Sequence, residues 1–301
     1  VYSIDCTGQT DAILQPSGTT AQRPGTVVGG LVRYNSENDC EKELSKNDYK
    51  KAKQEAEKLI NNDPFSGNFC MAKVLFSENK AQESIALFEK TEKLAQHPAD
   101  QMLSIMFKGL AYKENNDLKQ ALSIFSTGYE TAKLGNSKFV QFERRFLIQM
   151  GDVKEKEKDN EKAYEYFAMA LKSSSNDDER AESYDRLAKS AASQGFYDRA
   201  REYSLKGSIM YQKSGYLGEF AELTILKGEY EVLDNDYEKG IRTLKDLEEL
   251  CIEAGGDYYL AKTYLKLYKL SKEDKDVYLA KAKEVATRIG ADDLIKDINS
   301  I

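Results

Sequence analysis

Residues 109–128 read GLAYKENNDLKQALSIFSTG, and this stretch contains the pattern that decides the fold. A small residue, Gly109, precedes a polar turn at Asn115-Asn116-Asp117, and a second small residue, Ala121, follows the turn. Phe125 comes four residues after Ala121 and Gly128 three residues later, which places all three on one helical face. The stretch therefore predicts two helices joined by a short turn, with small residues where the helices approach closely.

The same spacing recurs along the chain, which indicates internal repeats. Six residues, nearly all small, open a second helix at intervals of 32 to 42 residues. These openers are Ala52, Ser84, Ala121, Ala163, Ala200 and Gly240. A seventh, weaker pair of helices is expected after Gly255-Gly256, with Lys275 in the opening position. Because each hairpin leaves an apolar face that only its neighbour can cover, the repeats must stack.

This pattern resembles the tetratricopeptide repeat family, and the match extends over about residues 43–290. The third unit carries it best, with a small residue and an aromatic in the first helix and alternating small and large residues in the second. Those residues are Gly109, Tyr112, Ala121, Phe125 and Gly128. Units lack the usual Trp, mostly lack the closing Pro and are longer than usual, as in signal-transduction and peptide-sensing members of the family. The resemblance implies an all-α, right-handed solenoid of six to seven hairpins.

The first 42 residues differ in composition from the rest of the chain. Glycine, proline and threonine are frequent there, and these residues favour turns and extended chain over helix. We expect an extended segment over residues 1–42, in which 26–32 forms a short strand or an arm, and a repeat domain over 43–301. The chain begins with Val1, which fits either a processed or a truncated terminus.

Composition excludes several classes of function. The net charge of −7 disfavours a general attraction to nucleic acid or to anionic lipid. No stretch approaches the roughly 20 apolar residues of a membrane-spanning helix. The single histidine, His97, is expected to be an exposed residue at a helix end, and four cysteines without metal-ligand spacing provide no zinc site. We therefore predict a non-enzymatic protein without metal or cofactor.

Cysteine positions bear on the compartment. Cys6 and Cys40 could bracket the N-terminal segment with a disulfide, which would favour an exported, periplasmic or secreted protein. Cys70 and Cys251 fall inside helical patterns, where buried thiols are expected. A cytoplasmic location remains the alternative.

The family resemblance also implies a concave groove lined by the first helix of each unit. The charged residues expected to contact a partner there are Lys73, Arg145, Asp152, Lys156, Asp185, Lys189 and Glu229. We predict a scaffold or adaptor that binds a protein, as a peptide or helix in this groove; the alternative is a cytoplasmic peptide-sensing regulator that closes on a signalling peptide. Apolar Ile295, Ile298 and Ile301 further predict a homodimer through the C-terminal end.

Overall fold

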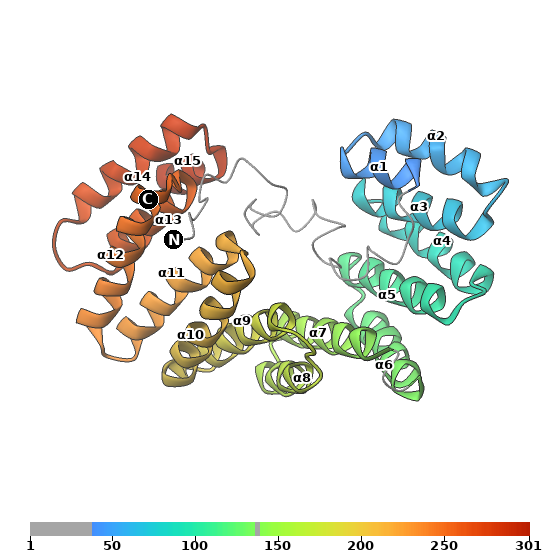
Figure 1. Ribbon diagram of the computed structural model, residues 1–301, viewed down its shortest axis with the longest axis horizontal. Helices are drawn as coiled ribbons and strands as arrows, with labels where there is room; N and C mark the ends of the chain where they lie inside the picture. Colours follow the sequence, from blue (N-terminus) through green and yellow to red (C-terminus); the bar gives the residue numbers. More distant parts are fainter. Residues whose placement is uncertain (1–37, 136–138) are drawn as a thin grey trace. The chain divides into compact units, whose positions relative to one another are not determined.

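A computed structural model describes residues 38–135 and 139–301, which form helices and no strand (Figure 1). These helices belong to two compact units that divide between Ser173 and Ser174. The N-terminal unit contains α1 (Asp39–Ser45), α2 (Tyr49–Ile60), α3 (Pro64–Ser77), α4 (Ala81–Leu94), α5 (Pro98–Glu114), α6 (Leu118–Leu134), α7 (Val140–Lys156) and α8 (Asn160–Lys172). The C-terminal unit contains α9 (Asp177–Ser193), α10 (Tyr197–Ser214), α11 (Leu217–Leu233), α12 (Tyr237–Ala254), α13 (Asp257–Leu270), α14 (Lys275–Ile289) and α15 (Asp292–Asn299).

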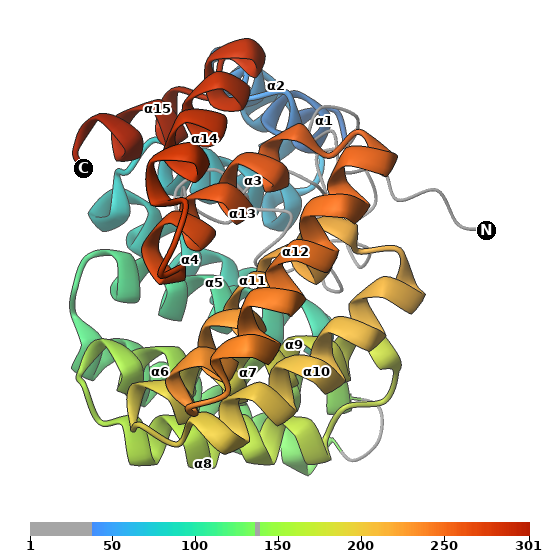
Figure 2. The same cartoon turned by 90° about the vertical axis from the view of Figure 1, so that its left-hand side faces the viewer.

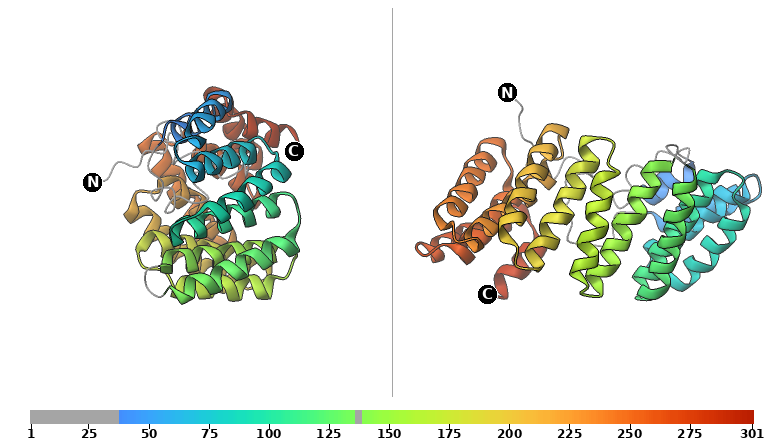
Figure 3. Two further views of the ribbon diagram at one scale, coloured as in Figure 1. Left: turned by 90° about the vertical axis from the view of Figure 1, so that its right-hand side faces the viewer. Right: turned by 90° about the horizontal axis from the view of Figure 1, so that it is seen from below.

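Consecutive helices pair into seven hairpins, from α1 with α2 to α13 with α14, and α15 follows the last one. Within each unit, the second helix of a hairpin also packs on the first helix of the next hairpin, as α4 does on α5 and α10 on α11. The two helices of a hairpin lie side by side in Figure 2 for α11 to α14 and in Figure 3 for α5 to α8. This arrangement confirms the predicted all-α repeat fold of six to seven hairpins.

Glycines in the first helices make room for large side chains of the second helices. A Cβ atom added at Gly109 would lie 2.3 Å from Cε1 of Phe125, and one at Gly151 would lie equally close to Cε1 of Phe167. Both rings are fully buried. The predicted positions of small and large residues therefore correspond to direct contacts between the helices of a hairpin.

The turn inside each hairpin uses one residue in the left-handed region. Glycine occupies this position at Gly195, and asparagine occupies it in four other hairpins. In the turn between α7 and α8 the residue is Lys158, with φ of 63°. Asparagine and glycine tolerate this conformation best, because other side chains bring Cβ too close to the backbone. This requirement explains the polar turns that separate the helices in the sequence.

The N-terminal boundary and the disulfide differ from the sequence-based expectation. Helix α1 begins at Asp39, so residues 39–42 are helical; the strand or arm expected over 26–32 lies outside the described residues. Cys40 forms a disulfide with Cys70 of α3, with the two Cα atoms 6.4 Å apart. The predicted Cys6–Cys40 disulfide is therefore wrong, because a sulfur atom forms one such bond, and Cys70 is buried as a half-cystine, not as a thiol. Cys6 lies outside the described residues.

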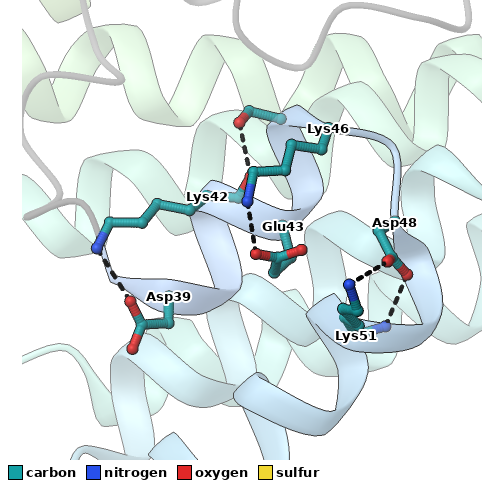
Figure 4. Close-up of polar contacts among 7 residues, drawn as sticks. Asp39, Lys42, Glu43, Lys46, Asp48 and Lys51 are labelled. Atoms are coloured by element: carbon teal, nitrogen blue, oxygen red, sulfur yellow. Dashed lines mark hydrogen bonds and ion pairs between the residues drawn. The ribbon is translucent and has the colours of Figure 1, made fainter.

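Short-range ion pairs and a capping hydrogen bond lie along α1 and the start of α2 (Figure 4). Lys42 pairs with Asp39 at 3.0 Å, and Lys46, which follows the end of α1, pairs with Glu43 at 2.7 Å; in each pair the residues are three positions apart. Asp48 caps α2 by accepting a hydrogen bond from the backbone N–H of Lys51. These contacts pair most of the exposed charges at this end of α1 and α2 within one helical turn.

At the other end of the chain, α15 covers the last hairpin. Its Leu294 and Ile298 are buried against α13 and α14. The hydroxyl of Tyr258 in α13 donates a hydrogen bond of 2.7 Å to Asp293. Ile298 packs within the chain and Ile295 is partly buried against the same helices, whereas Ile301 is 54% exposed, so the C-terminal homodimer stays a prediction.

Candidate functional site

The first helices of successive hairpins are linked by ion pairs, which together mark one face of each unit. In the N-terminal unit, α1 is linked to α3, and α5 to α7; in the C-terminal unit, α11 is linked to α13. The pairs are Glu41–Lys73, Lys113–Asp152, Glu114–Lys156, Glu222–Lys262 and Glu229–Lys266. We call this set the first-helix ladder. It contains four of the seven residues predicted to contact a partner.

The ladder has a signature in the sequence that the analysis of single residues missed. Its hydrogen-bonded partners are separated by 32, 39, 40 and 37 residues, in the same range as the repeat length. Opposite charges one repeat apart meet because they occupy equivalent positions on neighbouring first helices. A search for such charge pairs would have identified the six other members, which are Glu41, Lys113, Glu114, Glu222, Lys262 and Lys266.

Lys73 lies at the most buried pair of the ladder. Its side chain is 6% exposed, and its Nζ is 2.5 Å from Oε2 of Glu41. The same ammonium lies 5.6 Å from the centre of the Phe69 ring and 5.7 Å from that of Phe107. Attraction between a cation and aromatic faces adds to the ion pair. These contacts give Lys73 a structural role that links α1, α3 and α5.

The predicted residues of α7 are distributed from the interior to the solvent. Asp152 lies 3.5 Å from Nζ of Lys113, which also donates a hydrogen bond of 2.6 Å to Gln149. Lys156 is exposed and lies 4.0 Å from Glu114. Arg145 is half-buried, whereas its neighbour Arg144 is fully buried in the unit. A partner could therefore reach the end of α7 more readily than its middle.

In the C-terminal unit, α9 contributes the other predicted pair. Lys189 donates a hydrogen bond of 2.9 Å to Asp185, one turn earlier on the same helix. Behind them, Tyr211 of α10 is buried. Burial first, and then the carboxylates of Asp185 and neighbouring acidic residues, raises the pKa of Tyr211 well above its usual range. Its hydroxyl therefore stays protonated and can act as a hydrogen-bond donor.

Glu229 of α11 has a partner on the next hairpin. Its Oε2 lies 2.5 Å from Nζ of Lys266, and Glu222, two turns earlier, pairs with Lys262. All four side chains retain 18–28% exposure. These two pairs are more exposed to solvent than the pair between Lys73 and Glu41.

Among residues 38–135 and 139–301 no group of His, Cys, Asp and Glu side chains is arranged to hold a metal ion. Over the same residues, no helix combines the length and apolar character that crossing a membrane requires. His97 precedes α5 as an exposed N-cap residue that makes no capping hydrogen bond with its side chain.

Comparison with known proteins gives a result for the fold. No family model matches the chain, and no curated protein sequence matches it. Among solved structures, the chain is similar to apo RapI, with a TM-score of 0.63 and 10% identity over 75% of this chain and 84% of that one. It is also similar to the apo form of the quorum sensor NprR from B. thuringiensis, with a TM-score of 0.63 and 14% identity over 90% and 79%.

A third similar structure is a signal-transduction ATPase with numerous domains and a tetratricopeptide repeat sensor, PH0952 from Pyrococcus horikoshii. The TM-score is 0.65 at 17% identity, and the match covers 85% of this chain but 42% of that protein. Identities this low establish architecture and leave activity open. With hairpins that stack within each unit and small residues at their contacts, the described residues have the helical repeat fold of tetratricopeptide proteins.

Proposed function

We propose that the protein is a non-enzymatic adaptor that binds a peptide or helix of another protein on the face marked by the first-helix ladder. The observation that carries this proposal is the presence of two partly exposed ion pairs between α11 and α13, Glu222–Lys262 and Glu229–Lys266. Each of these ion pairs presents a carboxylate and an ammonium group to solvent and links α11 to α13. Such a surface can recognise a segment through several modest contacts.

Charge is distributed unevenly on this face, which favours particular partners. On this face α11 carries the carboxylates of Glu222 and Glu229, whereas α13 carries the ammonium groups of Lys262 and Lys266. A bound segment would therefore place basic residues towards α11 and acidic residues towards α13. Complementary charges of this kind mainly set orientation and the rate of association.

A charge swap tests the proposal while preserving the internal ion pair. Peptides selected from a random library on the immobilised full chain are measured by fluorescence anisotropy against the wild type and against Glu229→Lys combined with Lys266→Glu. The double variant keeps a pair across α11 and α13 but reverses its polarity, so we expect a loss of affinity of about tenfold or more with unchanged thermal stability. Arg242→Gln, an exposed change on α12, is the matched control.

Equal affinity for the wild type and the swapped variant would contradict binding on this face. The same measurement on Lys156→Glu combined with Glu114→Lys then tests the N-terminal unit separately. Loss of binding there alone would move the site to α5 and α7.

A regulator that senses a peptide is the second candidate function, and the similarity to the quorum sensor NprR and to a tetratricopeptide repeat sensor favours it. A sensor should change its dimensions when the peptide binds, and a static adaptor should not. Small-angle scattering with and without the selected peptide distinguishes the two, since a constant radius of gyration at saturation argues against the sensor.

We further propose that the protein works in an oxidising compartment, on the support of the Cys40–Cys70 disulfide. Disulfides persist in exported proteins and are rare in the cytosol. Counting reactive thiols in denatured, unreduced protein purified from its source tests this. Four reactive thiols would contradict it, whereas protection of Cys40 and Cys70 would agree with it.

A further inference from the structure

A surface cavity of about 370 Å³ lies in the C-terminal unit, where the end of α12 meets α13 and α14. Its apolar wall consists of Ile252, Leu260 and Val285, one residue from each helix. Leu260 and Val285 are 5% and 6% exposed, whereas Ile252 is 57% exposed. An aliphatic side chain thus faces solvent beside a buried apolar wall. The volume lies at the small end of the range for ligand pockets, which is roughly 300–1,000 Å³.

Arg288 supplies unused hydrogen-bond donors at this cavity. Its side chain is 55% exposed, and its Nη2 donates one hydrogen bond of 2.8 Å to Oδ1 of Asp257. A guanidinium group has five N–H donors and can bind a carboxylate through two of them at once. Within the described part of the chain, Arg288 makes no other ion pair, so it retains donors for a second carboxylate.

Glu284, one turn before Arg288 on α14, also lines the cavity. It forms no ion pair with any of the described residues. Side chains four residues apart on a helix have Cβ atoms about 5–6 Å from each other. The cavity therefore has an uncommitted anion and a cation with spare donors, separated by about one helical turn.

The remaining charged residues of the cavity already have partners. Lys281 donates a hydrogen bond of 3.3 Å to Glu248 and lies 5.0 Å from the centre of the Tyr264 ring, and Asp257 pairs with Arg288. The lining contains two acidic residues, Asp257 and Glu284, and two basic residues, Lys281 and Arg288, so its net charge is zero. A ligand without net charge that carries both signs complements such a site.

We propose that this cavity binds a short aliphatic peptide of about two residues as its zwitterion. The peptide carboxylate accepts hydrogen bonds from Arg288, the ammonium group pairs with Glu284, and the aliphatic side chains contact Ile252, Leu260 and Val285. A single amino acid fits less well, because its two charges are attached to one carbon atom and cannot span a helical turn. The site uses none of the residues of the first-helix ladder, so it is separate from the function proposed above.

NMR titration of the full chain with leucyl-leucine tests the proposal. We expect saturable shifts confined to amides of α12, α13 and α14, with affinity about tenfold weaker in Arg288→Gln and in Glu284→Gln. Arg288→Lys keeps the charge but lacks the two-pronged geometry, so it should also weaken binding. Arg242→Gln, exposed on α12, should leave the affinity unchanged, and thermal unfolding checks that each variant is folded.

Capped peptides assign each charge to its residue. Leucyl-leucinamide lacks the carboxylate, so it should bind the wild type about tenfold more weakly than leucyl-leucine does. On the Arg288→Gln variant the two peptides should bind with equal affinity, because the group that recognises the carboxylate is already missing. N-acetyl-leucyl-leucine should show the same relation to Glu284→Gln. The proposal is overturned if a peptide capped at both ends binds the wild type as well as leucyl-leucine does, or if no saturable shift appears at millimolar peptide.

Discussion

The two units share one hairpin design but hold their helices together with different chemistry. In the N-terminal unit phenylalanine rings pack against one another. The centre of the Phe69 ring lies 5.7 Å from that of Phe88 and 5.3 Å from that of Phe107, with the rings edge to face in both cases. The C-terminal unit places tyrosines in its core, and Tyr258 keeps a hydrogen bond to Asp293. Repeated small residues fix where the helices meet, and they leave open which side chains fill the contact.

The two units also differ in the bonds that link their helices. A disulfide between Cys40 and Cys70 joins α1 to α3 in the N-terminal unit. In the C-terminal unit a buried carboxylate, Glu231, accepts a hydrogen bond of 2.6 Å from Thr243 and lies 2.9 Å from Nζ of Lys227. We therefore expect the N-terminal unit to respond to reduction and to changes of side-chain volume, and the C-terminal unit to respond to pH.

Removing the disulfide should have the largest effect and should be confined to one unit. Cys40→Ala combined with Cys70→Ala should lower the free energy of unfolding of the N-terminal unit by about 3–4 kcal/mol, because the bond closes a loop of 30 residues. Amide hydrogen exchange should show a loss of protection in α1 to α4 and unchanged protection in α12 to α14. Equal loss in both units would contradict the comparison, and reduced wild type should behave as the variant does.

Gly109→Ala should have the second largest effect on the free energy of unfolding. A Cβ atom there meets the ring of Phe125, and overpacking should cost about 2–3 kcal/mol although alanine favours helix by about 1 kcal/mol. Adding Phe125→Leu to Gly109→Ala should restore part of the lost stability, as urea unfolding would measure. Gly228→Ala is the matched change in the C-terminal unit, where the nearest side-chain atom is Cγ of Leu244 at 2.8 Å. If the changes in the free energy of unfolding caused by Gly109→Ala and Phe125→Leu simply add in the double variant, direct contact between the two residues is not the cause.

Glu231→Gln probes the ionic chemistry of the C-terminal unit. Burial raises the pKa of Glu231, but hydrogen bonds from Thr243 and Lys227 outweigh burial and bring the pKa below its usual value. A lowered pKa in the folded state means stabilisation that is complete above the unfolded-state pKa of about 4.3 and is lost as the pH falls through the folded value.

The variant should therefore be less stable than the wild type by about 1–2 kcal/mol at pH 7, and the difference should shrink below about pH 4. Thermal unfolding at several pH values measures this, with Asp198→Asn, an exposed change on α10, as the control. A difference that stays constant with pH would show that shape, not charge, is responsible.

Lys158→Asn should have the smallest effect, and it should stabilise the protein. Lys158 adopts φ of 63° in the turn between α7 and α8, where the corresponding residue between α9 and α10 is Gly195. Asparagine accepts the left-handed region more easily, so the free energy of unfolding should rise by roughly 0.5–1 kcal/mol. The same substitution at Lys133, which lies inside α6, should give no such gain.

The position of the hairpins could be predicted because it depends on properties local in the sequence. Ala121, Phe125 and Gly128 occupy one helical face by their spacing alone, and Asn116 fits the left-handed turn before them. All six openers lie in second helices. Side-chain volume and turn geometry act over a few residues, so one sequence is enough to find them.

The predicted partner-binding residues could be placed only in part. Lys73 and Glu229 belong to the predicted set and both lie in the ladder, but Lys73 is buried between Glu41 and two rings, whereas Glu229 is partly exposed. The rings of Phe69 and Phe107, on α3 and α5, lie beside Lys73, and this neighbourhood depends on residues outside its own repeat. Equivalent sequence positions therefore end in different surroundings.

The sequence by itself determined the repeat length, the hairpin and the contacts between small and large residues, because these follow from spacing along single helices. Only the tertiary structure decided that Cys40 bonds with Cys70, that α1 begins at Asp39, and that α12, α13 and α14 enclose a cavity beside Arg288. The disulfide and the cavity depend on distances between side chains of different helices. Such distances result from the packing of all the intervening side chains, which no local pattern specifies.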